Sequence, residues 1–405
     1  MKHIVALDVG TTTVRCHIID ENAAVVSSST EKFHNMERFK SRFYGQGMES
    51  FNNDKRIAHG CLYSLHIVEE QTLSRRQCFQ IYEYPGRHIT DVSSASATGL
   101  FDPFTMKWAT WILSLLKIPS HVFPKIVDTI TNFGVTPKHI FGVEIPIVCC
   151  MADQSASLFG SGCFQPGDMK ITMGTGTFLD VNTGTEPHVS ITGLYPLVGW
   201  RIGSELVYII EGASNDTGTL IDWAKALEIY KDVAETADLA YSVEDSDGVY
   251  FIPAFTGLQA PINNHTAAAG FLGVKSTTKK GHIVRSLLES LVFRTLLLYD
   301  SLRTETCYAY KKTRIDGGVS QNDFIMQLLA DLTGLEVERP VNVEMSTFGV
   351  ALCAGLHCGI WRDREELKHL RKIDKIFKPN KSSRLCYENT IAQWKRAVDR
   401  FKDWY

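Results

Sequence analysis

The sequence predicts an α/β fold, because segments with the pattern of strands alternate with segments with the pattern of helices along most of the chain. Two observations carry this prediction. One pattern occurs twice, as LDVGTTT at 7–13 and TMGTGTF at 172–178. It consists of a strand, a turn of only glycine and threonine, and a second strand. A strand, a glycine turn and a helix then follow one another at 313–334.

The individual elements follow from hydrophobic periodicity and turn residues. Two short strands are expected at 3–9 and 14–19, whereas 33–89 follows neither a strand nor a helix period, so that we expect it to be weakly ordered. Further along, the patterns predict a helix over 106–118 ended by Pro119, a strand over 144–152, a short helix that begins at Asp153, a strand–turn–strand over 167–184, helices over 216–230 and 282–302, the strand and helix of 313–334, and an amphipathic helix from about Leu385.

Composition narrows the class of protein. The chain has 405 residues, enough for two domains, with 44% apolar and 21% charged residues, as in an ordinary globular protein. The net charge of −3 and the lack of a dense basic block argue against nucleic-acid binding. The ten cysteines form no CxxC pair, which is typical of a reducing compartment. No apolar run has the length of a membrane span, and the first one stops at Asp8, too short for a secretory signal, so we expect a cytoplasmic protein.

The two glycine–threonine turns are candidate phosphate loops. Glycine lets the backbone approach a ligand closely, and threonine hydroxyls add donors beside the backbone N–H groups, which together suit phosphate oxygens. A plain hairpin explains either turn alone equally well, but two of them suggest two halves of the chain that present loops to one nucleotide. Asp8 precedes the first turn and is a candidate ligand for Mg²⁺ beside a triphosphate. No GxxxxGK[ST] pattern occurs, so a P-loop is excluded.

Two further features are candidate parts of a site. The turn DGGVSQND at 316–323 could support an adenine ring, with Gly318 allowing close approach and Asn322 bonding the base, or it could be an ordinary strand-to-helix turn. Asp153 stands between a strand and a helix, where it could act as a general base or merely cap the helix. The ends of strands are where ligands bind in α/β sheets, which favours the first role.

Five stretches resemble the FGGY family of carbohydrate kinases, in the order found in that family. They are ALDVGTTTVR, ADQSASLFG, MGTGTFLDVNTG, GFLGVKSTTKKGHIVRSLLES and IDGGVSQNDFIMQLLADLTG. Their residues and spacing are most similar to those of the glycerol kinase branch. Two further stretches, FGVEIPIV before ADQSA and GVYFIPAFTGLQAP, strengthen that similarity. The resemblance covers the chain up to about residue 30 and nearly everything from Thr90 onward.

The resemblance implies an actin-like, ribonuclease-H-like fold whose two domains close over ATP and Mg²⁺. The acceptor-side domain would be residues 1–166 and the nucleotide-side domain residues 167–405. The implied reaction is phosphorylation of a small polyol, glycerol to glycerol 3-phosphate. No nucleic acid and no membrane span are expected, and a homo-oligomer is left open.

The resemblance also implies a set of site residues. Asp153 matches the aspartate that deprotonates the acceptor, and Gln154 and Phe178 match its substrate-contacting neighbours. Several members of the glycerol kinase branch have glutamine where this chain has Asp222. The implied nucleotide contacts are Thr11, Thr12, Thr13 and Arg15 on the first phosphate loop, Thr175 on the second, Gly218 and Asp222 in GTLIDW, and Gly318 and Asn322 at the adenosine site.

The chain departs from the family in its first part. Glycerol kinases carry a Q-R-E or Q-R-A segment whose arginine grips the polyol, a W-x-D segment and a substrate-contacting tyrosine, and none is recognisable here. Segment 33–89 is shorter than its counterpart by roughly a hundred residues. We therefore expect either a kinase with an altered acceptor site or an inactive remnant that binds nucleotide or another protein. A third alternative is a chaperone- or actin-like ATPase, but the ADQSA motif argues against it.

Overall fold

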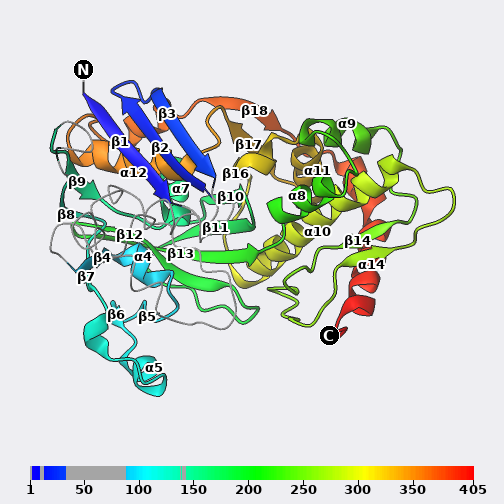
Figure 1. The fold of residues 1–405 in the computed structure, drawn as a ribbon, viewed down its shortest axis with the longest axis horizontal. Helices are drawn as coiled ribbons and strands as arrows, with labels where there is room; N and C mark the ends of the chain where they lie inside the picture. Colours follow the sequence, from blue (N-terminus) through cyan, green and yellow to red (C-terminus); the bar gives the residue numbers. More distant parts are fainter. Residues whose placement is uncertain (1, 10–12, 33–87, 137, 139–142) are drawn as a thin grey trace, which may run out of the picture.

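The computed structural model describes residues 2–9, 13–32, 88–136, 138 and 143–405. Figure 1 shows the β1–β3 sheet above α12 at one end of the molecule, and the helices α8 to α11 and α14 at the other. A seven-stranded sheet runs between the two ends. The expected α/β architecture is confirmed. The expectation for 33–89 falls almost entirely on 33–87, outside the described residues.

The seven-stranded sheet mixes antiparallel and parallel pairing. Its strands are, in spatial order, β12 (Tyr195–Ile202), β13 (Glu205–Ser214), β11 (Thr177–Gly184), β10 (Met169–Met173), β16 (Lys312–Asp316), β17 (Glu336–Pro340) and β18 (Ile373–Phe377). The first four pair antiparallel, and β10, β16 and β17 run parallel. Because Thr172 of β10 pairs with Asp316 of β16, the two parallel strands end side by side. The turns that follow them therefore leave the sheet at one edge, where ligands bind in such folds.

Helices pack against this sheet. They are α8 (Gly218–Ala226), α9 (Thr236–Tyr241), α10 (Lys280–Glu305), α11 (Asp323–Thr333) and α14 (Lys381–Phe401), with the hairpin β14 (Tyr250–Ile252) and β15 (Gly270–Leu272). The long helix α10 buries apolar residues at helical spacing, among them Leu287, Leu291 and Leu298, in a core shared with β10 and β11. Helix α11 begins at an Asn322 cap and ends at Gly334, whose φ of 75° is left-handed.

A second core lies under the three-stranded antiparallel sheet. This sheet consists of β1 (His3–Val9), β2 (Thr13–Asp20) and β3 (Val25–Lys32). Beneath it, α7 (Asp153–Gly160) crosses α12 (Met345–His357) so closely that a Cβ on Gly160 would lie 2.7 Å from the Met345 oxygen. The aromatic rings of Phe159 and Trp200 fill the same core.

Shorter elements complete the fold. They are β4 (Ile89–Asp91), α4 (Val92–Ser96), β5 (Phe101–Asp102), β6 (Lys107–Trp108), α5 (Thr110–Leu115), the 3₁₀ turn η1 (Ser120–Val122), β7 (Lys125–Val127), β8 (Ile130–Val135), β9 (Pro146–Cys149), η2 (Val233–Glu235), η3 (Gly318–Gln321) and α13 (Arg364–Leu370). Among the described residues, no helix combines the length and the apolar character needed to cross a membrane.

The sequence-based elements are largely confirmed, with one clear correction. The strand–turn–strand, the long helix, the glycine turn with its helix, and the C-terminal helix are all present. The helix predicted over 106–118 is instead limited to Thr110–Leu115. Met106 has a left-handed φ of 57°, and Lys107–Trp108 pair with Phe101–Asp102, so the first part of the segment is a small hairpin.

Candidate active site

Two turns and a helix N-terminus meet at the edge of the seven-stranded sheet. The turn 174–176 joins β10 to β11, and the first turn of α8 packs directly on it. The Gly218 N–H donates to the oxygens of Gly174 (3.0 Å) and Thr175 (2.8 Å). A Cβ on Gly218 would lie only 2.6 Å from the Gly174 oxygen, so this approach requires glycine. The expected nucleotide contacts Thr175 and Gly218 are thus adjacent.

The third glycine turn joins the same group. Gly317 has a φ of 86°, and a Cβ there would lie 2.5 Å from the Met173 oxygen, so η3 begins against the end of β10. By contrast, a Cβ on Gly174 or on Gly318 would meet nothing within 4 Å. The two turns are therefore packed together on one side and open on the other, which leaves room for a ligand to approach their backbones.

Asn322 and Asp222 belong to the helices that follow these turns, Asn322 as the cap of α11 and Asp222 within α8. The Asn322 side chain caps α11, accepting from the Ile325 N–H (3.1 Å), and its amide donates to Thr236 Oγ1 (2.8 Å). Asp222 is exposed on α8, beyond the helix's first turn. The local role of Asn322 as a helix cap is therefore clear, and a further contact with a base would use its remaining donor or lone pair.

The first glycine–threonine turn is described only at its ends. Thr11 and Thr12 lie outside the described residues, and Thr13 is a buried residue at the start of β2. Arg15, two residues further along β2, pairs with Asp8 (3.6 Å) and with Glu344 (3.0 Å). The guanidinium of Arg15 is thus held between two carboxylates.

Asp8 and Asp153 come from separate segments and influence one another. Asp8 is only 5% exposed, and its Oδ2 accepts a hydrogen bond from Ser346 Oγ (2.7 Å). Burial and then the charge of Asp153 raise the pKa of Asp8 to about 6, against the opposing effect of Ser346 and Arg15. The structure therefore brings together the two acidic residues that the sequence singled out.

Asp153 is the first residue of α7 and does not cap it. The cap position is Ala152, which makes no side-chain cap bond, so the helix-capping explanation of Asp153 is wrong. The Ala152 N–H donates to Ser93 Oγ (2.9 Å), which is itself held by Asp91, so α4 fixes the backbone just before Asp153. The half-buried Asp153 carboxylate accepts from the backbone N–H (2.7 Å) and the side-chain amide (3.3 Å) of Gln154.

A buried charged network lies beneath Gln154, and sequence reasoning missed it. Lys170 on β10 is fully buried and forms an ion pair with Asp180 of β11 (2.7 Å). Glu211 of β13 lies close enough to Asp180 for the two carboxyl groups to interact, and burial followed by repulsion from Asp180 raises the pKa of Glu211 well above its ordinary value. The sequence feature that could have revealed this network is a charged residue within each predicted strand. Lys170 and Asp180 each stand between apolar residues. Phe178, the expected apolar substrate contact, is buried on β11 beside this network.

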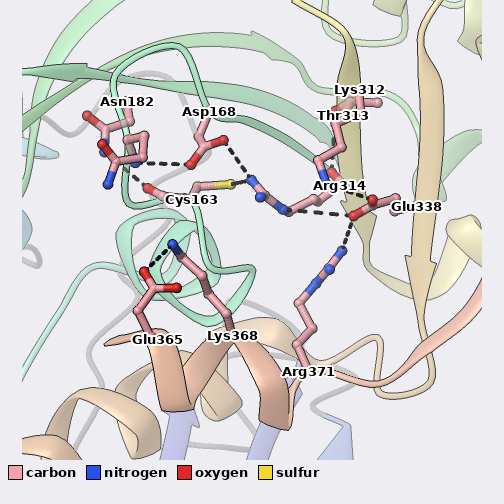
Figure 2. Close-up of polar contacts among 11 residues, drawn as sticks. Cys163, Asp168, Asn182, Lys312, Thr313, Arg314, Glu338, Glu365, Lys368 and Arg371 are labelled. Carbon is pink, nitrogen blue, oxygen red and sulfur yellow. Dashed lines mark hydrogen bonds and ion pairs between the residues drawn. The ribbon is translucent and has the colours of Figure 1, made fainter. Parts of the chain in front are cut away.

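A second polar cluster fastens the far end of α7 to the sheet (Figure 2). Arg314 of β16 contacts Cys163 Sγ (3.1 Å) and Asp168 (3.2 Å), just beyond the end of α7. On the other side of Arg314, Glu338 of β17 pairs with Lys312 (2.8 Å) and Arg371 (2.9 Å). The helix that carries Asp153 is therefore held at both ends.

Comparison with known proteins agrees with this geometry. Models of the FGGY family of carbohydrate kinases match the chain over residues 78–160 (N-terminal domain) and 169–358 (C-terminal domain). Among curated relatives, glycerol kinase 5 of Danio rerio is 51% identical over 323 residues, 78% of this chain and 61% of that protein. Glycerol kinase 5 of Homo sapiens is 48% identical over 318 residues, 78% of this chain and 60% of that protein. The chain thus spans about three fifths of the length of these relatives.

Solved structures agree on the fold. Plasmodium falciparum glycerol kinase with ADP superposes with a TM-score of 0.79 at 23% identity, covering 99% of this chain and 98% of that one. Xylulose kinase from Lactobacillus acidophilus gives a TM-score of 0.75 at 17% identity, covering 99% and 98%. The expected actin-like fold is confirmed. From the two family matches, the ordered motifs and this fold together, the chain belongs to the FGGY family of carbohydrate kinases.

Proposed function

We propose that this chain is an ATP-dependent kinase that phosphorylates a hydroxyl group of a small polyol, converting glycerol to glycerol 3-phosphate. The observations that carry the proposal are the charge of Asp153 acting on the buried Asp8, and the glycine-built turns at 174–176 and 317–318, which pack against each other. Phosphoryl transfer needs a carboxylate to accept the hydroxyl proton, donors for the phosphates and a cation, and little further chemistry from the protein. The relatives named glycerol kinase support the choice of glycerol as the acceptor.

In the proposed reaction Asp153 is the general base. As the acceptor oxygen forms its bond to the γ-phosphorus, its proton passes to the Asp153 carboxylate and the bond from that phosphorus to ADP breaks. Gln154 and Phe178 would contact the acceptor. The side chains of Thr11, Thr12, Thr13, Arg15 and Thr175 would bind phosphate oxygens, while Gly218, Asp222, Gly318 and Asn322 would line the nucleoside. Arg15 would then exchange its carboxylate partners for phosphate.

The residues present suit both a nucleotide and Mg²⁺. The open side of Gly174 and Gly318 can accept a ligand against the backbone. For the metal, Asp8 would supply a hard oxygen ligand, and a divalent cation would offset the repulsion that raises the pKa of Asp8. Mg²⁺ is commonly held by one or two carboxylates plus substrate phosphates, so Asp8 is a sufficient protein anchor. When bound, the ion would neutralise charge that develops on the phosphates.

The proposal keeps the division into residues 1–166 and 167–405. The two family models, which end at 160 and begin at 169, support a boundary between them. Helix α12 belongs to the second part of the chain but packs against α7 and β1 of the first. A cytoplasmic location is part of the proposal, supported by cysteines that form no CxxC pair, which is typical of a reducing compartment.

The decisive experiment measures ADP release with glycerol and Mg·ATP in a coupled assay. The Asp153→Asn variant keeps the size of the side chain but removes its proton-accepting carboxylate. Turnover should fall by about 10²–10⁴-fold, the usual contribution of a general base. Thermal stability should change little, because asparagine keeps the side-chain oxygen that accepts from the Gln154 N–H at the start of α7. Unchanged turnover in Asp153→Asn would rule out the assigned base.

A parallel measurement distinguishes the proposed kinase from the second candidate, an inactive remnant that binds nucleotide. It is favoured by the relatives' extra length and by the missing polyol-gripping segment. Calorimetric titration with Mg·ATP reports binding whether or not turnover occurs. Turnover is measured in this chain and in a version that also carries the segment of the relatives that this chain lacks. Binding without turnover in both versions would favour the remnant.

A further inference from the structure

Lys170 is a buried cation with specific partners under the candidate active site. Its side chain is 0% exposed, and its Nζ lies 2.7 Å from Asp180 Oδ2 and 2.7 Å from Thr172 Oγ1. A third contact joins Nζ to the side-chain oxygen of Gln154, which is itself buried at the start of α7. A bare ion pair would need only Asp180, so the contacts with Thr172 and Gln154 call for a separate explanation.

The chemistry of Lys170 decides which way the Gln154 amide points. An ammonium group has three donors and no acceptor, so it can face only the oxygen of that amide. The amide NH₂ of Gln154 must then point away from Lys170, and its nitrogen lies 3.3 Å from Asp153 Oδ2. The hydrogen bonds therefore form a chain with one donor direction, in which Lys170 donates to Gln154 and Gln154 donates to the Asp153 carboxylate. In the reversed orientation the Gln154 oxygen would face the oxygen of Asp153, and the two would repel.

We propose that Lys170 is a positioning residue for phosphoryl transfer, fixing the Gln154 amide so that it donates to Asp153 and holds the carboxylate toward the acceptor. This rests on the proposed function, because Asp153 matters as a base only if the chain transfers a phosphoryl group. Lys170 itself does not touch the acceptor. Its effect reaches the reacting atoms only through Gln154.

The rest of the network keeps Lys170 in place. Asp180 balances its charge, and Glu211 on the next strand interacts with Asp180. Thr172, which accepts from Lys170, donates in turn to Asp316, the residue before the glycine turn at 317–318. Gln154 on the acceptor side is therefore linked by consecutive hydrogen bonds to the turn on the nucleotide side.

The main variant of the test removes the buried cation together with its paired anion, and its comparison variant Asp180→Asn leaves Lys170 with the charges of Asp316 and Glu211. Replacing Lys170 alone would leave Asp180 as an uncompensated buried charge, which is strongly destabilising. The informative protein is therefore the double variant Lys170→Met/Asp180→Asn, compared with Asp180→Asn, in which Lys170 still faces Gln154. Lys312→Met serves as a control for loss of an ion-paired lysine, since Lys312 lies on β16 and pairs with Glu338. Thermal melts establish that each protein is folded.

Kinetics supply the first readout. In the double variant, kcat for glycerol phosphorylation should fall by about 10²-fold, the loss expected when a reacting group is misplaced by about 1 Å. The KM for ATP should stay within about twofold, because no phosphate contact is altered, and Asp180→Asn alone should lose less than tenfold. A double variant with the kcat of Asp180→Asn would overturn the proposal. A loss confined to the KM for ATP would do the same.

Nuclear magnetic resonance supplies a readout that does not depend on turnover. In protein labelled with ¹⁵N-glutamine, the side-chain amide signals of Gln154 are identified by their loss in Gln154→Asn. We expect these signals to move in the double variant and to stay close to their wild-type positions in Asp180→Asn and Lys312→Met. Unmoved signals in the double variant refute the orienting role of Lys170. If the unaltered chain shows no turnover, the proposed function fails, and the amide signals still decide whether Lys170 orients Gln154.

Discussion

The crossing of α7 and α12 makes Gly349→Ala a sharp test of how the candidate base is positioned. A Cβ on Gly349 would lie 1.7 Å from the Ala156 oxygen and 2.8 Å from the Gly160 nitrogen. Both obstructing atoms are backbone, so no rotamer change can relieve the contact. Ordinary contacts of this kind begin at 3.4 Å, so the helices must separate by about 1.7 Å at this point.

The cost of this separation can be bounded from the packing around it. Overpacking usually costs 1–3 kcal/mol, and a backbone-to-backbone obstruction in a core that also holds Phe159 and Trp200 belongs at the upper end, about 3 kcal/mol. For a chain of this size each kcal/mol lowers Tm by about 2 °C, so a fall of about 6 °C is expected. Since Asp153 is the first residue of α7, displacement of the helix should also lower kcat by about 10²-fold.

The assay combines a thermal melt with coupled ADP release on Gly349→Ala and on the control His357→Ala. His357 is exposed on the last turn of the same helix, so its replacement should shift Tm by less than about 1 °C. An unchanged Tm in Gly349→Ala would show that the helices do not cross as closely as described. A lowered Tm with wild-type kcat would show that the position of α7 does not govern Asp153.

Three other variants test separate parts of the structure. Thr175→Val removes the hydroxyl of the exposed Thr175 and should weaken Mg·ATP binding by about tenfold in calorimetry, whereas unaltered affinity would exclude Thr175 from the phosphate site. Asn322→Ala removes the helix cap of α11, so in the absence of nucleotide it should lower the free energy of unfolding by about 1 kcal/mol. An unchanged Tm in a thermal melt without nucleotide would contradict this capping role. Glu338→Gln should lower stability at neutral pH by about 2 kcal/mol. Burial opposes ionisation of Glu338, but Lys312 and Arg371 outweigh it and hold its pKa below the ordinary 4.5; its stabilisation is therefore complete above that value and lost as pH falls through the lowered pKa. The difference in Tm between Glu338→Gln and the unaltered chain should accordingly shrink below pH 4.5, and a difference constant down to pH 3 would refute this account.

The sequence by itself determined the elements whose signals are local. The β10–β11 turn is set by Gly174 and Gly176, which allow a tight connection between two apolar strands, and α11 is bounded by an Asn322 cap and a left-handed Gly334. Periodicity alone located the long helix α10. Asp8 and Asp153 could be singled out because each directly follows an apolar run.

Only the tertiary structure decided how these pieces combine. The sequence could not show whether the cap position of α7 is Asp153 or the residue before it. In the structure the cap position is Ala152, whose backbone N–H donates to Ser93 on α4, a helix far away in the sequence. Lysine in a strand ordinarily faces solvent, and no local pattern could reveal that Lys170 is buried between partners on α7 and β11. These contacts join segments far apart in the chain, so their energies act only after the fold has brought the segments together.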